Sequence, residues 1–200
     1  MSKQPPRPTK ETIETYDRSA EFFRRTWSAT SMQDKLTRFR GALPSDAQRV
    51  LDAGCGSGRD LCWMLERGLE VVGGDLSVAL LATARQSAPG GRVVRLDLQR
   101  LPLADGSFGG AWACASLLHL PRRQLPLALA ELARVLQPGG ALFLGMKRGK
   151  GEGWTNTGGG RRFFTYVETD ELIELVEAQG FAPNKMWRGE VWVDILARRL

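Results

Sequence analysis

The sequence predicts an α/β fold with a doubly wound, mostly parallel seven-stranded sheet, its last strand antiparallel, and a helical lid at the N-terminus. From Arg49 onward, short apolar runs alternate with amphipathic stretches, which is typical of strands joined by right-handed helical crossovers. A glycine-rich loop follows the first apolar run. Only a short turn containing glycine separates the last two runs, which favours antiparallel pairing and a reversed strand at the sheet edge. Ligands bind such sheets at the carboxyl ends of the strands, so we expect the site there.

The first part of the chain precedes the sheet. Residues 1–10 are polar and rich in proline, so we expect a flexible tail that lacks the apolar segment of a secretory signal. Residues 11–45 are expected to form a helical cap within a single domain of residues 11–200. Apolar side chains recur in this cap at spacings of three and four residues, at Ile13, Tyr16, Ala20, Phe23 and Trp27. Ser31 is expected to cap a second short helix.

The expected strands are short apolar runs bounded by glycine, proline or acidic residues. They cover residues 50–53, 71–75, 93–96, 111–115, 141–146, 185–188 and 191–198. The connecting helices are expected over residues 59–67, after a cap at Ser77, over residues 121–136, and from a cap at Thr169 or Asp170 to residue 179.

Composition sets limits on the class of protein. With 200 residues, of which 42% are hydrophobic and 25% charged, the chain is expected to bury a core without a disulfide or metal. Its cysteines, Cys55, Cys62 and Cys114, are odd in number and scattered, which indicates a reducing compartment and a cytoplasmic location. No apolar run is long enough to span a membrane, so no membrane partner is expected. The net charge of +6 leaves nucleic acid possible as a partner without identifying it.

The glycine loop carries the first chemical signal. Gly54, Gly56 and Gly58 stand at alternate positions between the first strand and the following helix, where they permit a sharp turn and close approach of a ligand. A dinucleotide-binding fingerprint requires a further glycine where this chain has Arg59. A carboxylate beside the loop, Asp52, would repel a pyrophosphate but suits a ligand with an ammonium group.

Acidic residues also end the next two strands. Asp75 stands where a carboxylate can accept hydrogen bonds from both hydroxyls of a ribose. Asp97 ends the third strand, where it can accept from an adenine amino group while Leu98 packs against the ring. Three acidic residues at successive strand ends therefore predict an adenosine ligand with a cationic tail and no phosphate.

This combination resembles the class I S-adenosylmethionine-dependent methyltransferases, in particular the small-molecule, type 11-like group. The resemblance covers about three quarters of the chain and rests on the glycine loop, Asp75 and residues 96–98, 101–103, 107–108, 117–119, 136–140 and 168–181. It implies a Rossmann-like methyltransferase fold and S-adenosylmethionine as the cofactor. The cofactor-binding residues that it implies are Asp52, Gly54, Gly56, Gly58, Asp75, Leu76, Asp97, Leu98 and Ser116.

One position departs from the family pattern. Where such proteins carry an acidic residue after the phenylalanine that starts the fourth strand, this chain has Gly109. We expect the change to affect packing at the start of that strand rather than cofactor binding.

The implied chemistry is an in-line displacement at an activated methyl group, which needs positioning of the nucleophile and, for some acceptors, removal of a proton. His119, the single histidine, is the candidate general base, and the alternative is that it packs at the start of the next helix. No covalent intermediate and no metal are required, so Cys114 is interpreted as a small buried residue.

The acceptor is predicted to be a small molecule. The loop after the fourth strand lacks the Asn-Pro-Pro-Tyr, Asp-Pro-Pro-Tyr and Pro-Cys elements, which argues against methylation of DNA bases or glutamine. Tyr16, on the helical lid, and Lys147 and Arg162, in a basic and aromatic loop over residues 147–166, are the candidate substrate residues. Alternatives are an RNA or protein methyltransferase that uses this basic loop, a non-catalytic S-adenosylmethionine-binding protein, and a nicotinamide-dependent dehydrogenase, against which Arg59 counts. The oligomeric state is left open.

Overall fold

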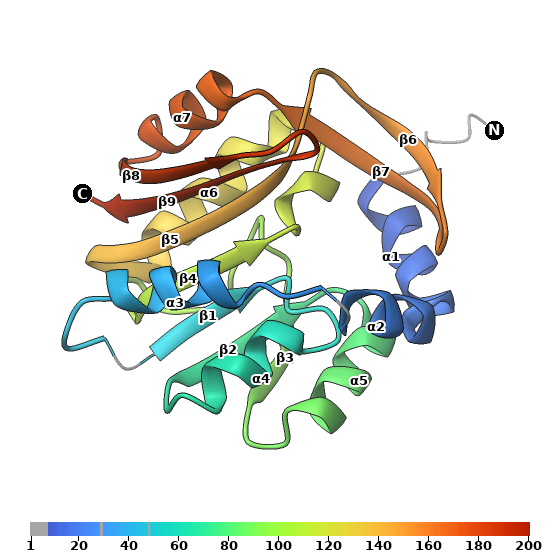
Figure 1. Ribbon diagram of the computed structural model, residues 1–200, viewed down its shortest axis with the longest axis horizontal. Coiled ribbons are helices and arrows are strands. Elements are labelled where there is room, and N and C mark those ends of the chain that lie inside the picture. Colours follow the sequence, from blue (N-terminus) through green and yellow to red (C-terminus); the bar gives the residue numbers. More distant parts are fainter. Residues whose placement is uncertain (1–7, 29, 48) are drawn as a thin grey trace.

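A mostly parallel sheet forms the centre of the computed structural model, which describes residues 8–28, 30–47 and 49–200. The predicted strands are present, in the spatial order β3-β2-β1-β4-β5-β9-β8 (Figure 1). Their bounds are β1 Arg49–Ala53, β2 Glu70–Asp75, β3 Arg92–Arg95, β4 Phe108–Cys114, β5 Leu136–Arg148, β8 Phe181–Arg188 and β9 Trp192–Arg199. Strands β1 to β5 run parallel, and β9 runs antiparallel to both β5 and β8. The fold class and the antiparallel last strand are confirmed.

The place of the reversed strand differs from the expectation. β9 lies between β5 and β8, so the edge strand is β8 and a reversed strand at the edge was wrong. The reason is burial: residues 193–197 of β9 are all buried, whereas β8 has exposed positions along its length. A run buried on both faces belongs inside a sheet.

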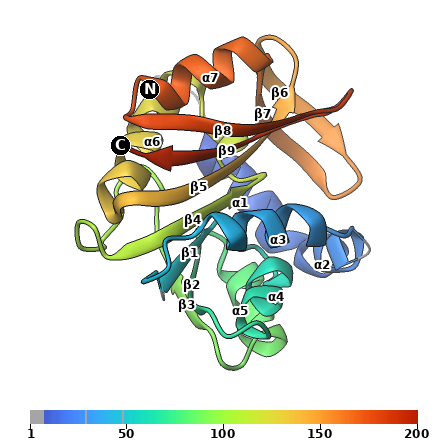
Figure 2. The same cartoon turned by 60° about the vertical axis from the view of Figure 1, so that its left-hand side comes forward.

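Helices cover both faces of the sheet. α3 (Gln33–Ala42) and α4 (Arg59–Leu65) pack on one face, and α6 (Leu125–Val135) and α7 (Thr169–Glu177) on the other (Figure 2). The remaining helices are α1 Pro8–Arg18, α2 Ala20–Ser28, α5 Val78–Ser87 and the single-turn helices η1 Leu117–His119 and η2 Arg122–Gln124. No helix within the described ranges is long and apolar enough to cross a membrane.

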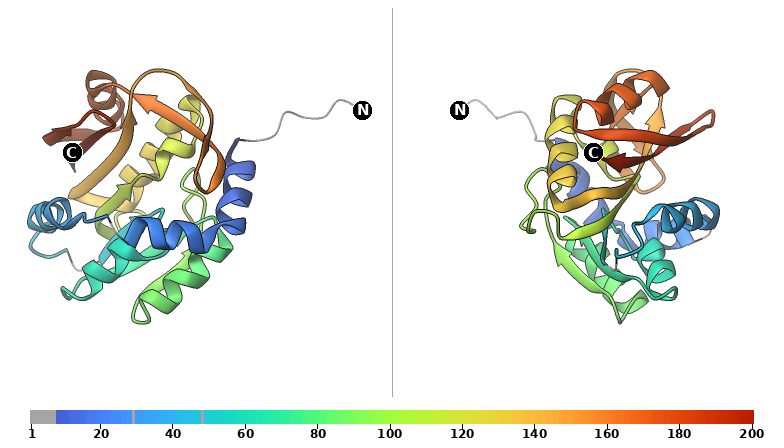
Figure 3. Two further views of the ribbon diagram at one scale, coloured as in Figure 1. Left: turned by 45° about the vertical axis from the view of Figure 1, so that its right-hand side comes forward. Right: turned by 90° about the vertical axis from the view of Figure 1, so that its left-hand side faces the viewer.

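A β-hairpin replaces the loop expected after the fifth strand. β6 (Glu152–Thr157) pairs with β7 (Gly160–Val167) around a Gly-Gly turn, and the described sheet therefore has nine strands, not seven. The hairpin extends beyond the central strands and packs against α1 (Figure 3). Polar side chains on both strands hid it from the hydrophobic pattern, although a two-residue glycine turn is itself a hairpin signal.

The predicted helix starts and caps were partly correct. α1 begins at Pro8, so the expected tail is helical at residues 8–10, while residues 1–7 lie outside the described chain. Ser77 caps α5 as expected and accepts a hydrogen bond from the Leu80 N–H at 3.2 Å. The cap at Ser31 was wrong, because Met32 occupies that position of α3 without a side-chain bond. The cap at Thr169 or Asp170 was also wrong, because Glu168 occupies that position of α7, likewise without a side-chain bond.

Gly109 has a packing explanation. A Cβ atom at this position would lie 2.0 Å from the Cβ of Ala47, in the segment that leads into β1. The departure from the family pattern therefore permits close packing at the start of β4, as expected.

Candidate active site

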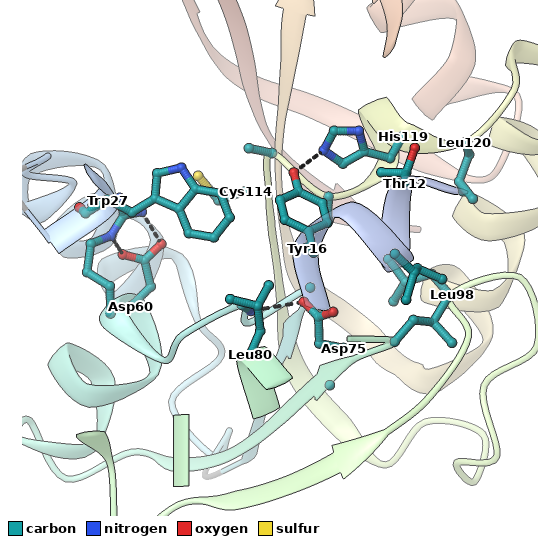
Figure 4. Close-up of a pocket in the computed structure, with 18 of the residues that line it drawn as sticks. Thr12, Tyr16, Trp27, Asp60, Asp75, Leu80, Leu98, Cys114, His119 and Leu120 are labelled. Carbon is teal, nitrogen blue, oxygen red and sulfur yellow. Dashed lines mark hydrogen bonds and ion pairs between the residues drawn. The ribbon is translucent and has the colours of Figure 1, made fainter. Parts of the chain in front are cut away.

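A cavity of about 500 Å³ opens at the carboxyl ends of the parallel strands, within the size range of small-molecule sites (Figure 4). Its floor is formed by the loops after β1, β2, β3 and β4, and α1 and α2 supply its roof. Most of the sequence-predicted site residues line it: Tyr16, Gly54, Gly56, Asp75, Leu76, Asp97, Leu98, Ser116 and His119. The other four, Asp52, Gly58, Lys147 and Arg162, do not line it.

The glycine loop is shaped for close approach. Gly54 has φ +90°, and a Cβ there would lie 2.2 Å from the Cβ of Ser116. Gly56 has φ +53°, and its Cβ would lie 3.2 Å from the Trp27 ring. The absence of both side chains therefore leaves room between the loop, the end of β4 and α2.

Asp75 is held rigidly at the end of β2. Its carboxylate accepts the backbone N–H of Gly56 at 3.0 Å and that of Ser77 at 2.9 Å. Burial raises the pKa of Asp75, and these two N–H groups oppose the rise. The carboxylate is thus fixed on the glycine loop and keeps further acceptor sites toward the cavity.

Asp97 is also held by a backbone N–H group, two residues after the end of β3. Its Oδ1 accepts the backbone N–H of Gln99 at 2.9 Å. Leu76 and Leu98 supply apolar surface in the wall beside the two carboxylates. Two acceptors with apolar side chains beside them match the polar edge and flat faces of a nucleoside.

Two buried polar atoms near the loop lack partners. Among the described residues, Asp52 Oδ2 and Ser116 Oγ are buried and make no hydrogen bond. Ser116 follows Ala115, which has φ +57°, a left-handed conformation that is uncommon for alanine. Unsatisfied polar atoms and backbone strain both concentrate at functional sites, and neither can be read from sequence.

Tyr16 and His119 both line the cavity and form a hydrogen-bonded pair, which we call the Tyr16–His119 pair (Figure 4). The Tyr16 hydroxyl lies 2.6 Å from His119 Nε2, and His119 Nδ1 lies 2.7 Å from the Phe163 carbonyl oxygen. Burial lowers the pKa of His119 to about 3 and raises that of Tyr16 to about 12. Both side chains are therefore neutral at physiological pH.

Three of the predicted residues that do not line the cavity make hydrogen-bond or packing contacts instead. Arg162 donates to the Tyr16 hydroxyl at 2.7 Å, and Lys147 Nζ lies 4.2 Å above the Phe164 ring. Gly58 has φ +89°, and a Cβ there would lie 3.0 Å from the Ala84 backbone, so this glycine allows α5 to pack closely.

Charged residues that the sequence reasoning missed lie at the end of the cavity away from Asp97. Lys35 Nζ pairs with Asp194 Oδ2 at 2.5 Å, and Arg59 pairs with Asp60 at 2.6 Å. Asp194 is buried within the apolar run of β9, and an acidic residue in such a run is the signal that was available.

Cys114 also lines this end of the cavity. Burial raises the pKa of its thiol well above the usual range. Cys114 is partly buried rather than fully buried as predicted, and a thiol whose pKa is raised in this way is a weak nucleophile.

Comparison with known proteins assigns the family. Residues 51–144 match a family model described as a methyltransferase domain. A malonyl-[acyl-carrier protein] O-methyltransferase of Pseudescherichia vulneris is 31% identical over 186 residues, which cover 90% of this chain and 67% of that protein. A protein of the same name from Erwinia pyrifoliae is 40% identical over 106 residues, so the match spans 51% of this chain and 38% of that relative's length.

Solved structures share the fold. The Burkholderia thailandensis 1,6-didemethyltoxoflavin-N1-methyltransferase has a TM-score of 0.78 at 23% identity, covering 100% of this chain and 92% of that one. The Synechocystis magnesium protoporphyrin IX methyltransferase has a TM-score of 0.78 at 16% identity and covers both chains completely. With the sequence relatives and the geometry of the cavity, these findings place the chain in the class I S-adenosylmethionine-dependent methyltransferases.

Proposed function

We propose that this chain transfers a methyl group from S-adenosylmethionine to an oxygen atom of a small-molecule acceptor. The observation that carries the proposal is the pair of fixed carboxylates, Asp75 and Asp97, beside a glycine loop whose neighbour Ser116 has an unpartnered hydroxyl. The choice of oxygen is supported by the names of the two relatives, both O-methyltransferases.

The cavity residues fall into three groups, one for each part of the cofactor. Asp97 and Leu98 would hold the adenine, with Leu76 against its face, and Asp75 would accept the ribose hydroxyls. Gly54 and Ser116 would face the methionine part. Its charged amino-acid end would meet the Arg59–Asp60 and Lys35–Asp194 pairs, which offer both signs of charge. Asp52 and Gly58 would shape the loop from behind.

When bound, S-adenosylmethionine supplies a methyl group already activated by the sulfonium. The protein then has to hold the acceptor in line with that group and keep water out. Tyr16 and Trp27, from the roof, are placed to do both, because they cover the cavity above the glycine loop. His119 would act through Tyr16 rather than as a free base, since its Nε2 already bonds the tyrosine hydroxyl.

A carrier-bound acyl group is a second candidate acceptor. The Pseudescherichia relative is named for a malonyl group carried on acyl carrier protein, and its match covers most of this chain. A small-molecule acceptor is preferred because α1 and α2 cover the cavity, and its volume is that of a small-molecule site.

Transfer of isotopic label tests the proposal. Protein is incubated with S-adenosylmethionine labelled in the methyl group and with cell extract, and small molecules, carrier proteins, other proteins and RNA are separated. The proposal predicts label in the small-molecule fraction. Label confined to carrier protein favours the second candidate, and label in RNA or in other proteins contradicts the proposal. Tight cofactor binding with no label anywhere would identify a non-catalytic binding protein.

A further inference from the structure

The hydrogen bonds around Tyr16 have only one possible direction. A backbone carbonyl accepts and never donates, so His119 Nδ1, which lies 2.7 Å from the Phe163 oxygen, must carry the ring hydrogen. In a neutral imidazole the other nitrogen, Nε2, then has a lone pair and no hydrogen. The bond of 2.6 Å between Nε2 and Tyr16 is therefore donated by the tyrosine hydroxyl.

Arg162 occupies the other side of the same oxygen. Its guanidinium donates to the Tyr16 hydroxyl at 2.7 Å, and an arginine side chain has no acceptor. Arg162 is held in place by bonds from two of its nitrogens to Thr157 Oγ1 and by the rings of Phe23 and Phe164, which lie 4.6 and 5.1 Å from its centre. Its donors are therefore engaged by Thr157 and Tyr16, and Arg162 itself does not line the cavity.

These two contacts determine which hydrogen bonds the Tyr16 hydroxyl can still form with a bound molecule. Its hydrogen is given to His119 and one lone pair receives Arg162, so the remaining capacity of the oxygen is that of an acceptor. Burial keeps both members of the Tyr16–His119 pair neutral, which preserves this direction across the physiological range of pH. Tyr16 and His119 both line the cavity, and Tyr16 lies within electrostatic reach of Asp75, at the cofactor end.

We infer that Tyr16 selects acceptors whose methylated atom carries a hydrogen, such as a phenol, an enol or an alcohol, and that Arg162 is a positioning residue for this contact. The inference rests on the proposed function. The acceptor hydroxyl donates to Tyr16, and this bond turns one of the acceptor's own lone pairs toward the methyl group. As the new C–O bond forms and the C–S bond breaks, the acceptor's hydrogen would pass to Tyr16 and the Tyr16 hydrogen to His119 Nε2, which leaves a methyl ether and S-adenosylhomocysteine. A carboxylate has no hydrogen to give, so it meets the tyrosine oxygen lone pair to lone pair and is disfavoured.

Competitive binding of two small probes tests the inference. Catechol and benzoate, a hydroxyl and a carboxylate probe of similar size, are titrated by ligand-observed NMR into the protein saturated with S-adenosylhomocysteine. Catechol is expected to bind more tightly. Tyr16→Phe is expected to weaken catechol about tenfold, the loss of one hydrogen bond, while benzoate and S-adenosylhomocysteine keep their affinities. The inference is overturned if benzoate binds as tightly as catechol or more tightly, or if Tyr16→Phe leaves the affinity for catechol unchanged.

Matched variants separate selection from folding. Tyr166→Phe removes the only other tyrosine hydroxyl, which contacts Thr155 away from the cavity, and is expected to change neither probe. Arg162→Met should weaken catechol, and Arg162→Lys, which restores a cationic donor, should recover part of the affinity. Equal loss in both arginine variants would assign Arg162 a structural role only.

The chemistry of the labelled product gives an independent test. Methyl esters release their methyl group in mild alkali, whereas methyl ethers keep it. The small-molecule label obtained with wild-type protein is expected to survive alkali, and alkali-labile label would overturn the inference. Failure to bind S-adenosylhomocysteine would instead contradict the proposed function, so the two failures are distinguishable.

Discussion

At the scale of single residues, the cavity depends on side chains whose protonation and direction are fixed by their neighbours. Asp75 is held by two backbone N–H groups, and the Tyr16–His119 pair is locked by a carbonyl on one side and Arg162 on the other. Such groups are already in place before a ligand binds. Ordering these side chains therefore costs little binding free energy, and their removal should affect binding more than folding.

Asp75→Ala is expected to weaken S-adenosylmethionine binding by about 2 kcal/mol, because the ribose hydroxyls lose their acceptor and remain buried. Calorimetric titration measures the change. Asp34→Ala, which removes an exposed carboxylate on α3, is the matched control and should leave the affinity unaltered. An unchanged dissociation constant in Asp75→Ala would remove this residue from the site.

The buried histidine should make stability depend on pH in the acid range. His119 has a pKa of about 3 in the folded protein against about 6.5 when unfolded, lowered by burial and by the nearby charges of Arg162 and Lys147. Between these values only the unfolded chain binds the proton, so the contribution is complete above pH 6.5 and is lost as pH falls toward 3. Urea unfolding should show a fall of about 1 kcal/mol per pH unit below pH 6 from this residue.

His119→Gln is the comparison for this effect, since glutamine does not titrate. Its stability curve should be flatter than that of the wild type between pH 6 and 4. Parallel curves for the two proteins would show that His119 is not held neutral in the fold.

At the scale of elements, the β6–β7 hairpin and α1 support one another. The Phe163 N–H donates to Thr12 Oγ1 at 3.0 Å, and the Thr15 hydroxyl donates to the Arg161 carbonyl at 2.8 Å. Since β7 carries both Arg162 and the Phe163 carbonyl, this contact sets the orientation of the Tyr16–His119 pair. The hairpin is thus part of the site although it does not line the cavity.

Thr12→Val tests the contact without changing side-chain volume. The buried Phe163 N–H would lose its acceptor, and we expect a loss of stability of about 1–3 kcal/mol. Thr83→Val, which removes a hydroxyl that bonds only within α5, should change stability by less than about 0.5 kcal/mol. Equal effects in denaturant unfolding would show that the hairpin is not anchored through Thr12.

At the scale of the whole molecule, the sequence predicts what local periodicity and chain order determine. β1, β2 and β3 are adjacent and parallel, so Asp52 in β1, Asp75 at the end of β2 and Asp97 just after β3 lie toward the same edge of the sheet, where Asp75 and Asp97 line the cavity. The Lys35–Asp194 pair joins residues 159 positions apart, and no local pattern predicts such a contact. The bond from Tyr16 to His119 likewise depends on how the cap docks on the finished sheet.

The central claim is that a sulfonium nucleoside without phosphates binds across these strand ends, and calorimetric titration of the purified chain tests it most directly. We expect saturable one-to-one binding of S-adenosylmethionine and of its demethylated product, with no response to NADH. Binding heat with NADH, together with no binding heat for S-adenosylmethionine or its demethylated product, would contradict the account.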